Sequence, residues 1–375
     1  MVKKETQCIH SGTIENGGTG GVTSPVFPST AFDYLEKDDL PYPRYFNTPN
    51  QKAVVEKVCA LEGAEDGVLF ASGMAAITTA IFAFAGSGDH VVMMDELYGG
   101  THAFATDQFK KFGIEHTFAA TDSGSIAAAI RENTKVIVLE SPANPLLGVI
   151  DIRKAAESAR GRKQKIITII DNTFATPVNQ NPLKYGIDVV VHSGTKYLGG
   201  HSDLCCGMTV TTKEYAKRIR ETAKHLGGSV NALTCYLLER SLKTLAIRVG
   251  RQTENAARIA EFLEANRKIK KVYYPGLDGS PHHELAKSQM EGFGAIVSFE
   301  PDADAGRFVR ALRLIKPAVS LGGIESTICS PAVTSHAKMS ADERKRIGIS
   351  DSLLRLSVGI EHSDDLLADI ERALK

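Results

Sequence analysis

The chain has 375 residues, of which 43% are hydrophobic and 23% are charged, as is ordinary for a soluble globular protein with one large and one smaller domain. Basic and acidic residues both number 44, so the formal net charge is zero and gives no overall attraction to nucleic acid. The six cysteines lack paired spacing, which predicts a cytoplasmic location. Polar residues follow residues 1–4, so we expect no signal peptide.

The first 45 residues predict an extended arm. They carry glycines at positions 17, 18, 20 and 21 and prolines at positions 25, 28, 41 and 43. The glycine run could suggest a dinucleotide-binding loop, but no strand precedes it and no helix follows it. A flexible loop is therefore favoured there.

The next region alternates short apolar strands with helical stretches, which predicts an α/β fold with a mostly parallel sheet covered on both faces. The uncharged run 68–86 is long enough to cross a membrane, but its alanines, threonines and glycine favour a buried helix. We therefore expect no membrane association. The expected strands cover 89–94, 135–139, 166–170 and 188–191, and the expected helices cover 73–84, 100–112, 123–131 and 151–160.

A long helix is expected over 233–265, and it leads to a second α+β segment that begins near residue 272. These patterns divide the chain into three parts. The expected parts are an arm over 1–45, a large domain over 46–232, and a linker helix with a small C-terminal domain over 233–375.

One turn between a strand and a helix could hold an anion. Residues 66–71 predict a strand, and Ser72, Gly73 and Met74 open the following helix. Ser72 can cap that helix, and Gly73 lets the backbone approach an anion closely. Such a turn is also ordinary in α/β proteins.

Lys196 follows the β-branched strand 188–191, and Asp171 directly follows the strand 166–170. Ligands of open α/β sheets collect at the carboxyl ends of strands, so both side chains are expected on one edge. A buried lysine has a lowered pKa and can attack a carbonyl to form a Schiff base. A carboxylate that keeps a pyridinium nitrogen protonated completes a site for pyridoxal 5'-phosphate, and Ser193 and Thr195 add hydroxyl donors.

Three other interpretations are weaker. The segment 193–197 is similar to a P-loop, but its lysine is followed by tyrosine and the upstream glycine spacing is absent. The segment 282–284 could suggest a metal site, but we expect it to be an exposed loop without metal. An inactive protein that keeps only the fold is disfavoured, because Lys196 and Asp171, which this cofactor chemistry needs, are both present.

The chain resembles the Cys/Met metabolism (transsulfuration) branch of fold-type I pyridoxal phosphate enzymes. That branch includes cystathionine γ-synthase, the cystathionine lyases and methionine γ-lyase. The resemblance runs over nearly the whole chain and implies an aspartate aminotransferase-like fold. The motifs that carry it lie at residues 6–12, 42–44, 72–76, 98–101, 140–145, 171–177, 192–203, 320–323 and 355–359.

The resemblance also implies roles for individual residues. Lys196 would carry the cofactor and later a proton, Asp171 would face the pyridine nitrogen, and Tyr98 would stack on the ring and exchange a proton. Thr173 would lie beside the ring, while Arg355 with Asn144 and Ser320 would grip the substrate carboxylate. The phosphate would be bound by Ser72, Gly73, Met74, Ser193 and Thr195, together with Tyr42 and Arg44 from a neighbouring subunit.

Each site would therefore need a homodimer, and the resemblance favours a tetramer of two dimers. The implied substrate is a sulfur amino acid. Asn47-Thr48-Pro49 departs from the usual Asn-Pro-Thr order near Arg44, and Gly100 replaces the cysteine typical of methionine γ-lyases. Val319 replaces a glutamate common in γ-specific enzymes, whereas Glu325 resembles the cystathionine enzymes. These features favour a lyase that cleaves L-cystathionine by β- or γ-elimination, with a γ-replacing synthase as the alternative.

Overall fold

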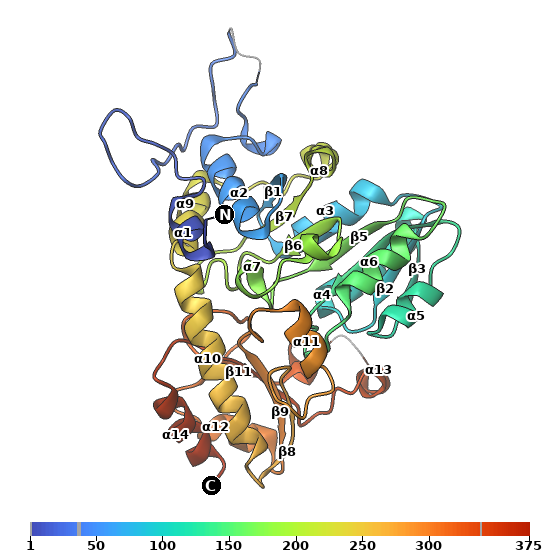
Figure 1. Ribbon diagram of the computed structural model, residues 1–375, viewed down its shortest axis with the longest axis vertical. Coiled ribbons are helices and arrows are strands. Elements are labelled where there is room, and N and C mark those ends of the chain that lie inside the picture. Colours follow the sequence, from blue (N-terminus) through green and yellow to red (C-terminus); the bar gives the residue numbers. More distant parts are fainter. Residues whose placement is uncertain (1, 36–38, 338–339) are drawn as a thin grey trace.

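A computed structural model describes residues 2–35, 39–337 and 340–375, apart from the side chain of residue 343. Two sheets organise the chain, one in the first two thirds and one near the C-terminus (Figure 1). The α/β fold class predicted from the alternating pattern is confirmed. No helix in the described ranges is both long enough and apolar enough to cross a membrane.

The larger sheet has seven strands in the order β1-β7-β6-β5-β4-β2-β3. Only β7 runs antiparallel to its neighbours, so the sheet is mostly parallel as predicted. The carboxyl ends of β4, β5 and β6 consequently lie along one edge. The strands are β1 (Asp66–Phe70), β2 (His90–Met94), β3 (Glu115–Ala119), β4 (Thr134–Glu140), β5 (Ile167–Asp171), β6 (Val189–His192) and β7 (Gly207–Thr211).

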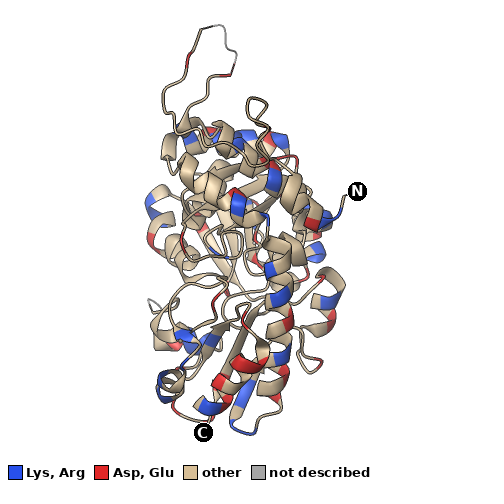
Figure 2. Ribbon diagram, turned by 90° about the vertical axis from the view of Figure 1, so that its left-hand side faces the viewer, with Lys and Arg blue, Asp and Glu red and all other residues tan. Residues whose placement is uncertain are grey.

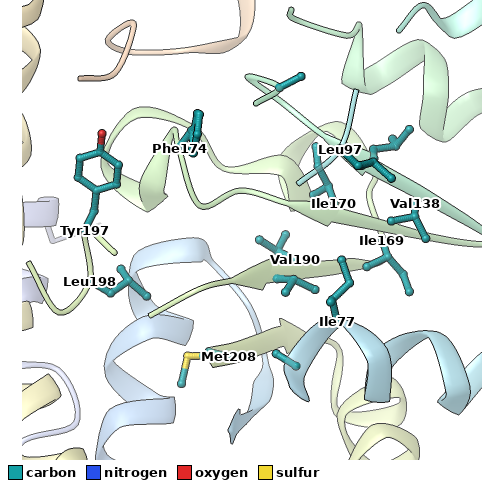
Figure 3. Close-up of a cluster of buried hydrophobic side chains, with 14 of the residues drawn as sticks. Ile77, Leu97, Val138, Ile169, Ile170, Phe174, Val190, Tyr197, Leu198 and Met208 are labelled. Atoms are coloured by element: carbon teal, nitrogen blue, oxygen red, sulfur yellow. The ribbon is translucent and has the colours of Figure 1, made fainter. Parts of the chain in front are cut away.

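Helices cover both faces of this sheet. Successive residues Ile169 and Ile170 are fully buried, although neighbouring strand residues point to opposite faces. Figure 3 shows this packing, with Ile77 of a helix near Ile169 and Val190 of the strands. The helices of this part are α1 (Lys4–His10), α2 (Pro49–Glu62), α3 (Gly73–Phe84), α4 (Gly99–Gln108), α5 (Ser123–Ala128), α6 (Ile152–Arg160), α7 (Thr176–Asn179) and α8 (Lys213–Leu226).

The smaller sheet has five strands in the order β10-β11-β12-β9-β8, and this confirms the expected C-terminal α+β segment. Figure 2 shows basic and acidic residues interspersed along the helices of this part, in keeping with the zero net charge. The helices and strands of this C-terminal part are α9 (Ala232–Leu242), α10 (Leu245–Glu264), β8 (Ile269–Tyr273), α11 (His283–Gln289), β9 (Ile296–Pro301), α12 (Ala305–Ala311), β10 (Lys316–Pro317), β11 (Thr327–Cys329), α13 (Ala341–Arg346), β12 (Leu354–Ser357) and α14 (Ser363–Ala373).

The prediction of a single helix over 233–265 is wrong, because the helix is interrupted at residues 243–244, between α9 and α10. The buried guanidinium of Arg248 stabilises the break. It donates to the carbonyl oxygen of Ser241 at 3.0 Å and to Oγ1 of Thr244 at 3.1 Å. The freed carbonyl at the end of α9 is therefore satisfied by a side chain. The expected helix 100–112 likewise ends at Gln108 and continues as a 3₁₀ turn over Phe109–Phe112.

The arm is not extended throughout, because residues 4–10 form α1. The buried ammonium of Lys57 in α2 donates to the carbonyl oxygens of Cys8 at 3.1 Å and of Ile9 at 3.3 Å. Lys57 thereby holds the end of α1 against the body. The unusual order at residues 47–49 suits the start of α2, where Thr48 caps the helix and Pro49 occupies its first turn.

The segment 282–284 is also different from the exposed loop expected there. His283 begins α11, and its Nδ1 lies 3.0 Å from the carbonyl oxygen of Pro275. Its ring stacks on Phe293 with a centroid separation of 5.3 Å. This packing occupies His283 in the contact between α11 and the body.

Candidate active site

A cavity of about 410 Å³ lies where the carboxyl edge of the large sheet faces the smaller sheet. Side chains from both parts of the chain line it. Of the predicted site residues, the cavity brings together Ser72, Gly73, Met74, Tyr98, Asn144, Asp171, Thr173, Ser193, Thr195, Lys196, Ser320 and Arg355.

The turn before α3 has the geometry of an anion cradle. Oγ of Ser72 accepts a hydrogen bond from the backbone N–H of Ala75 at 3.1 Å, which confirms Ser72 as the helix cap. A Cβ at Gly73 would lie only 2.8 Å from Cβ of Ser193, so only glycine allows this approach. The first N–H groups of α3 have no partner within the helix and, with the hydroxyl of Ser193, would supply donors for a phosphate. The hydroxyl of Thr195 also lines the cavity and here donates to the carbonyl oxygen of Cys206 at 3.1 Å.

Asp171 ends β5 at the floor of the cavity. Its Oδ1 accepts from the backbone N–H of Thr173 at 2.9 Å, and Oγ1 of Thr173 accepts from the N–H of Ser193 at 2.8 Å. Burial raises the pKa of Asp171, while the bond to Thr173 and the charges of His192 and Lys196 act against that rise. A cationic ring nitrogen beside Asp171 would favour the carboxylate, so this position fits a pyridinium partner.

Lys196 lies in the turn after β6, and its Nζ donates to Oγ of Ser320 at 2.7 Å. Burial lowers the pKa of Lys196, and the nearby charge of Arg355 lowers it further. The neutral amine that attacks a carbonyl is thereby more accessible. The segment between β10 and β11 can approach the backbone at Lys196 and Tyr197 because residue 322 is glycine. Its φ is +79°, and a Cβ there would lie 2.7 Å from the backbone nitrogen of Tyr197.

Arg355 reaches the cavity from β12 and is 4% exposed. Its Nη1 donates to Oδ1 of Asn144 at 2.8 Å, and its Nη2 lies 3.4 Å from the carbonyl oxygen of Ser320. Its Nε is buried and has no hydrogen-bond partner among the described residues. A buried guanidinium with a donor to spare suits a small carboxylate.

Tyr98 stands at the mouth of the cavity just before α4, with 44% of its surface exposed. A Cβ at Gly100 would lie 2.5 Å from Cε1 of the Tyr98 ring. Glycine at position 100 is therefore required for this ring position.

The whole chain matches one family model. The model is described as Cys/Met metabolism PLP-dependent enzyme, and the match covers residues 5–375. The chain belongs to this family. It is therefore a pyridoxal phosphate-dependent enzyme, as the chemistry of Lys196 and Asp171 predicted.

Several known proteins are similar to this chain over nearly their whole length. The chain is 42% identical to the cystathionine beta-lyase MetC of Bacillus subtilis over 377 residues, covering 99% of this chain and 96% of that protein. It is 41% identical to the cystathionine gamma-lyase of the same organism over 380 residues, with complete coverage of both. The solved structure of cystathionine gamma-lyase from Lactobacillus plantarum complexed with L-serine superposes with a TM-score of 0.95 at 40% identity, covering 99% and 98% of the two chains.

The residues of the cavity fit the family's cofactor. The cradle before α3 would hold the phosphate, Asp171 the ring nitrogen and Lys196 the aldehyde carbon. Bound there, pyridoxal phosphate supplies an electron sink for negative charge at the substrate α-carbon.

Tyr42 and Arg44 do not line the cavity of their own chain. The Arg44 guanidinium donates to the carbonyl oxygen of Lys224 at 2.8 Å and lies 5.7 Å and 5.4 Å from the ring centroids of Tyr42 and Tyr45. The prediction that Tyr42 and Arg44 serve a neighbouring subunit's phosphate site stays a prediction.

Several cavity residues were given no role by the sequence. Glu140 had a readable signal, because it follows the predicted strand 135–139 as Asp171 follows its own strand. The thiols of Cys205 and Cys329 and the residues Thr334 and Ser335 gave no such signal, since they come from distant loops and from the short strand β11.

Proposed function

We propose that the protein is a carbon–sulfur lyase that cleaves L-cystathionine by elimination and also accepts related sulfur amino acids. The observation that carries the proposal is the placement of a reactive amine beside a guanidinium that can bind a substrate carboxylate. Nζ of Lys196 contacts Ser320, whose own backbone carbonyl faces the guanidinium of Arg355. An amino acid held by its carboxylate at Arg355 would present its α-carbon to Lys196. The substrate class is supported by the printed names of the relatives.

The residues of the cavity divide the work of the reaction. Arg355, held by Asn144, binds the substrate carboxylate in a bidentate pair. The neutral Lys196 removes the α-proton as a general base, and Asp171 keeps the ring nitrogen protonated. The phenol of Tyr98 at the mouth of the cavity delivers a proton to the departing sulfur. The carbon–sulfur bond breaks with its electron pair on sulfur, which takes the proton of Tyr98 while Lys196 gains the α-proton. Protons and electrons therefore balance without an added reductant.

The side chain at position 319 bears on the site of cleavage. Val319 lines the cavity, is 70% exposed and offers no carboxylate to the distal amino group of a long substrate. This favours elimination at the β-carbon, whose unsaturated amino-acid product is hydrolysed by water to pyruvate and ammonium. A Cβ at position 100 would lie too close to the Tyr98 ring, which disfavours the methionine γ-lyase alternative, because that family member typically has cysteine there.

We further propose that the enzyme works as a homo-oligomer in which the arm of one subunit completes the phosphate site of another. The support is the position of Arg44, which is exposed and outside its own chain's cavity. The division at residues 45 and 232 and the cytoplasmic location stay predictions.

One substrate panel tests the reaction. Cystathionine, methionine, cysteine and O-acylhomoserine with cysteine are each given to the cofactor-loaded enzyme, and pyruvate and 2-oxobutyrate are measured separately. We expect fastest turnover with cystathionine and mainly pyruvate. If the enzyme joins cysteine to O-acylhomoserine much faster than it cleaves cystathionine, the synthase alternative is correct and the lyase proposal fails.

A further inference from the structure

We propose that Glu140 is a positioning residue, whose one carboxylate sets both the ring-stacking Tyr98 and the substrate-binding Arg355. Glu140 ends β4 and is 5% exposed. Its Oε2 accepts from the backbone N–H of Tyr98 at 2.8 Å, and its Oε1 accepts from the backbone N–H of Asn144 at 3.1 Å. The proposal rests on the cofactor and amino-acid binding described above, but not on which amino acid is the substrate.

The two N–H groups belong to segments that form opposite parts of the site. Tyr98 precedes α4 at the mouth of the cavity. Asn144 lies in the loop after β4, where its Oδ1 accepts from Nη1 of Arg355 at 2.8 Å. Arg355 in turn approaches Ser320, which accepts from Nζ of Lys196. A shift of Glu140 would therefore move the aromatic ring and the carboxylate grip together.

The arrangement needs a carboxylate and not merely a side chain of that size. Both oxygens of Glu140 accept hydrogen bonds, and an ionised group accepts more strongly than a neutral one. Burial and the charge of Asp171 raise the pKa of Glu140, and the Tyr98 and Asn144 N–H groups and Arg355 offset only part of that rise. The geometry, in which each oxygen accepts from a backbone N–H, is what requires the carboxylate.

A buried carboxylate that only supports the fold would behave differently. Asp369 in α14 gives a matched comparison, because it is 2% exposed and accepts from the backbone N–H groups of Arg313, Leu314 and Ile315. None of these four residues lines the cavity. Loss of the charge at Asp369 should affect the fold alone.

The test compares Glu140→Gln with Asp369→Asn in the cofactor-loaded enzyme. Glycine, which has a carboxylate but no leaving group, is titrated while the cofactor absorbance is recorded. Glutamine keeps one acceptor and turns an amide donor toward an N–H group, so we expect glycine binding to weaken about 10- to 100-fold. Asp369→Asn should lower the melting temperature and leave glycine affinity within about twofold.

A second measurement distinguishes positioning from general weakening. Because Glu140 acts through Arg355, Glu140→Gln should weaken glycine binding much less in an Arg355→Lys background than in the parent. Independent, multiplying effects of the two substitutions would overturn the proposal. Unchanged glycine affinity in Glu140→Gln would also overturn it, as would a Glu140→Gln chain that fails to fold. Any of these results leaves the lyase proposal standing, since that is decided by the products from cystathionine.

Discussion

The lining of the cavity and the arm differ in how they are exposed. In the lining, Asp171, Lys196 and Arg355 are hydrogen-bonded to neighbours within the chain. In the arm, Tyr34 is 70% exposed and Leu35 is 63% exposed. These apolar side chains are available for contact with another molecule. The difference supports the proposal that one chain assembles the reactive part of the site, while the arm acts on a second copy.

The largest effect is expected from Lys196→Ala, which tests the reactive part of the cavity lining. Loss of the amine removes both the covalent attachment of the cofactor and the base that takes the α-proton, so turnover should fall by at least about 10³-fold. Borohydride reduction followed by peptide mapping should attach the cofactor to Lys196 in the parent enzyme only. A variant that keeps substantial turnover would place the reactive amine elsewhere.

The arm is tested by Arg44→Ala. If Arg44 binds the phosphate in a neighbouring subunit, its loss should weaken cofactor binding by on the order of 2–3 kcal/mol without unfolding the chain. The cofactor retained after dialysis measures the first effect, and circular dichroism measures the second. Lys52→Ala is a matched control, because Lys52 is an exposed cation whose ammonium pairs with Asp39 at 2.7 Å.

Mixed subunits make the same comparison stricter. A dimer of one Arg44→Ala chain and one Lys196→Ala chain would contain one site with both groups intact. Mixing the two weakly active or inactive variants should therefore restore part of the activity. No recovery after subunit exchange has been verified would count against a shared site.

Some site residues follow from local sequence patterns, whereas others depend on packing between distant segments. Lys196 and Asp171 were readable, because apolar strands end just before them and parallel strands share an edge. Arg355 and Asn144 are 211 residues apart and meet only through packing of the two sheets, so no local pattern connects them and their roles needed a family resemblance. The break at residues 243–244 was missed because no glycine or proline marks it.

Glu140 shows a further limit of sequence interpretation. Its position after a strand was visible, but its partners are backbone N–H groups of Tyr98 and Asn144. Every residue except proline carries such a group, so the side chains at those positions give no signal. Only the folded chain reveals which donors face the carboxylate.

A smaller effect is expected at the carboxylate grip. Arg355→Lys keeps the positive charge but loses the planar fork, so amino-acid binding should weaken by about 1–3 kcal/mol. The cofactor absorbance in the absence of substrate should stay unchanged, because Arg355 is assigned to the substrate and not to the cofactor. Glycine titration monitored by absorbance measures the affinity. Equal affinity in the variant and the parent would show that the substrate carboxylate is bound by another group.

The smallest effect is expected at Val319, a residue of the cavity lining that is as exposed as Tyr34 of the arm. Val319→Glu would place a carboxylate next to Ser320, within the cavity lining but 70% open to solvent in the parent. An exposed ion pair with the distal ammonium of cystathionine contributes about 1 kcal/mol or less, so the ratio of products should shift about fivefold at most. The shift should run from pyruvate toward 2-oxobutyrate, because the new charge favours the pose that presents the γ-carbon. Val319→Gln, with similar size but no charge, should leave the ratio close to that of the parent. If both variants change the ratio equally, side-chain volume and not charge selects the carbon that is cleaved.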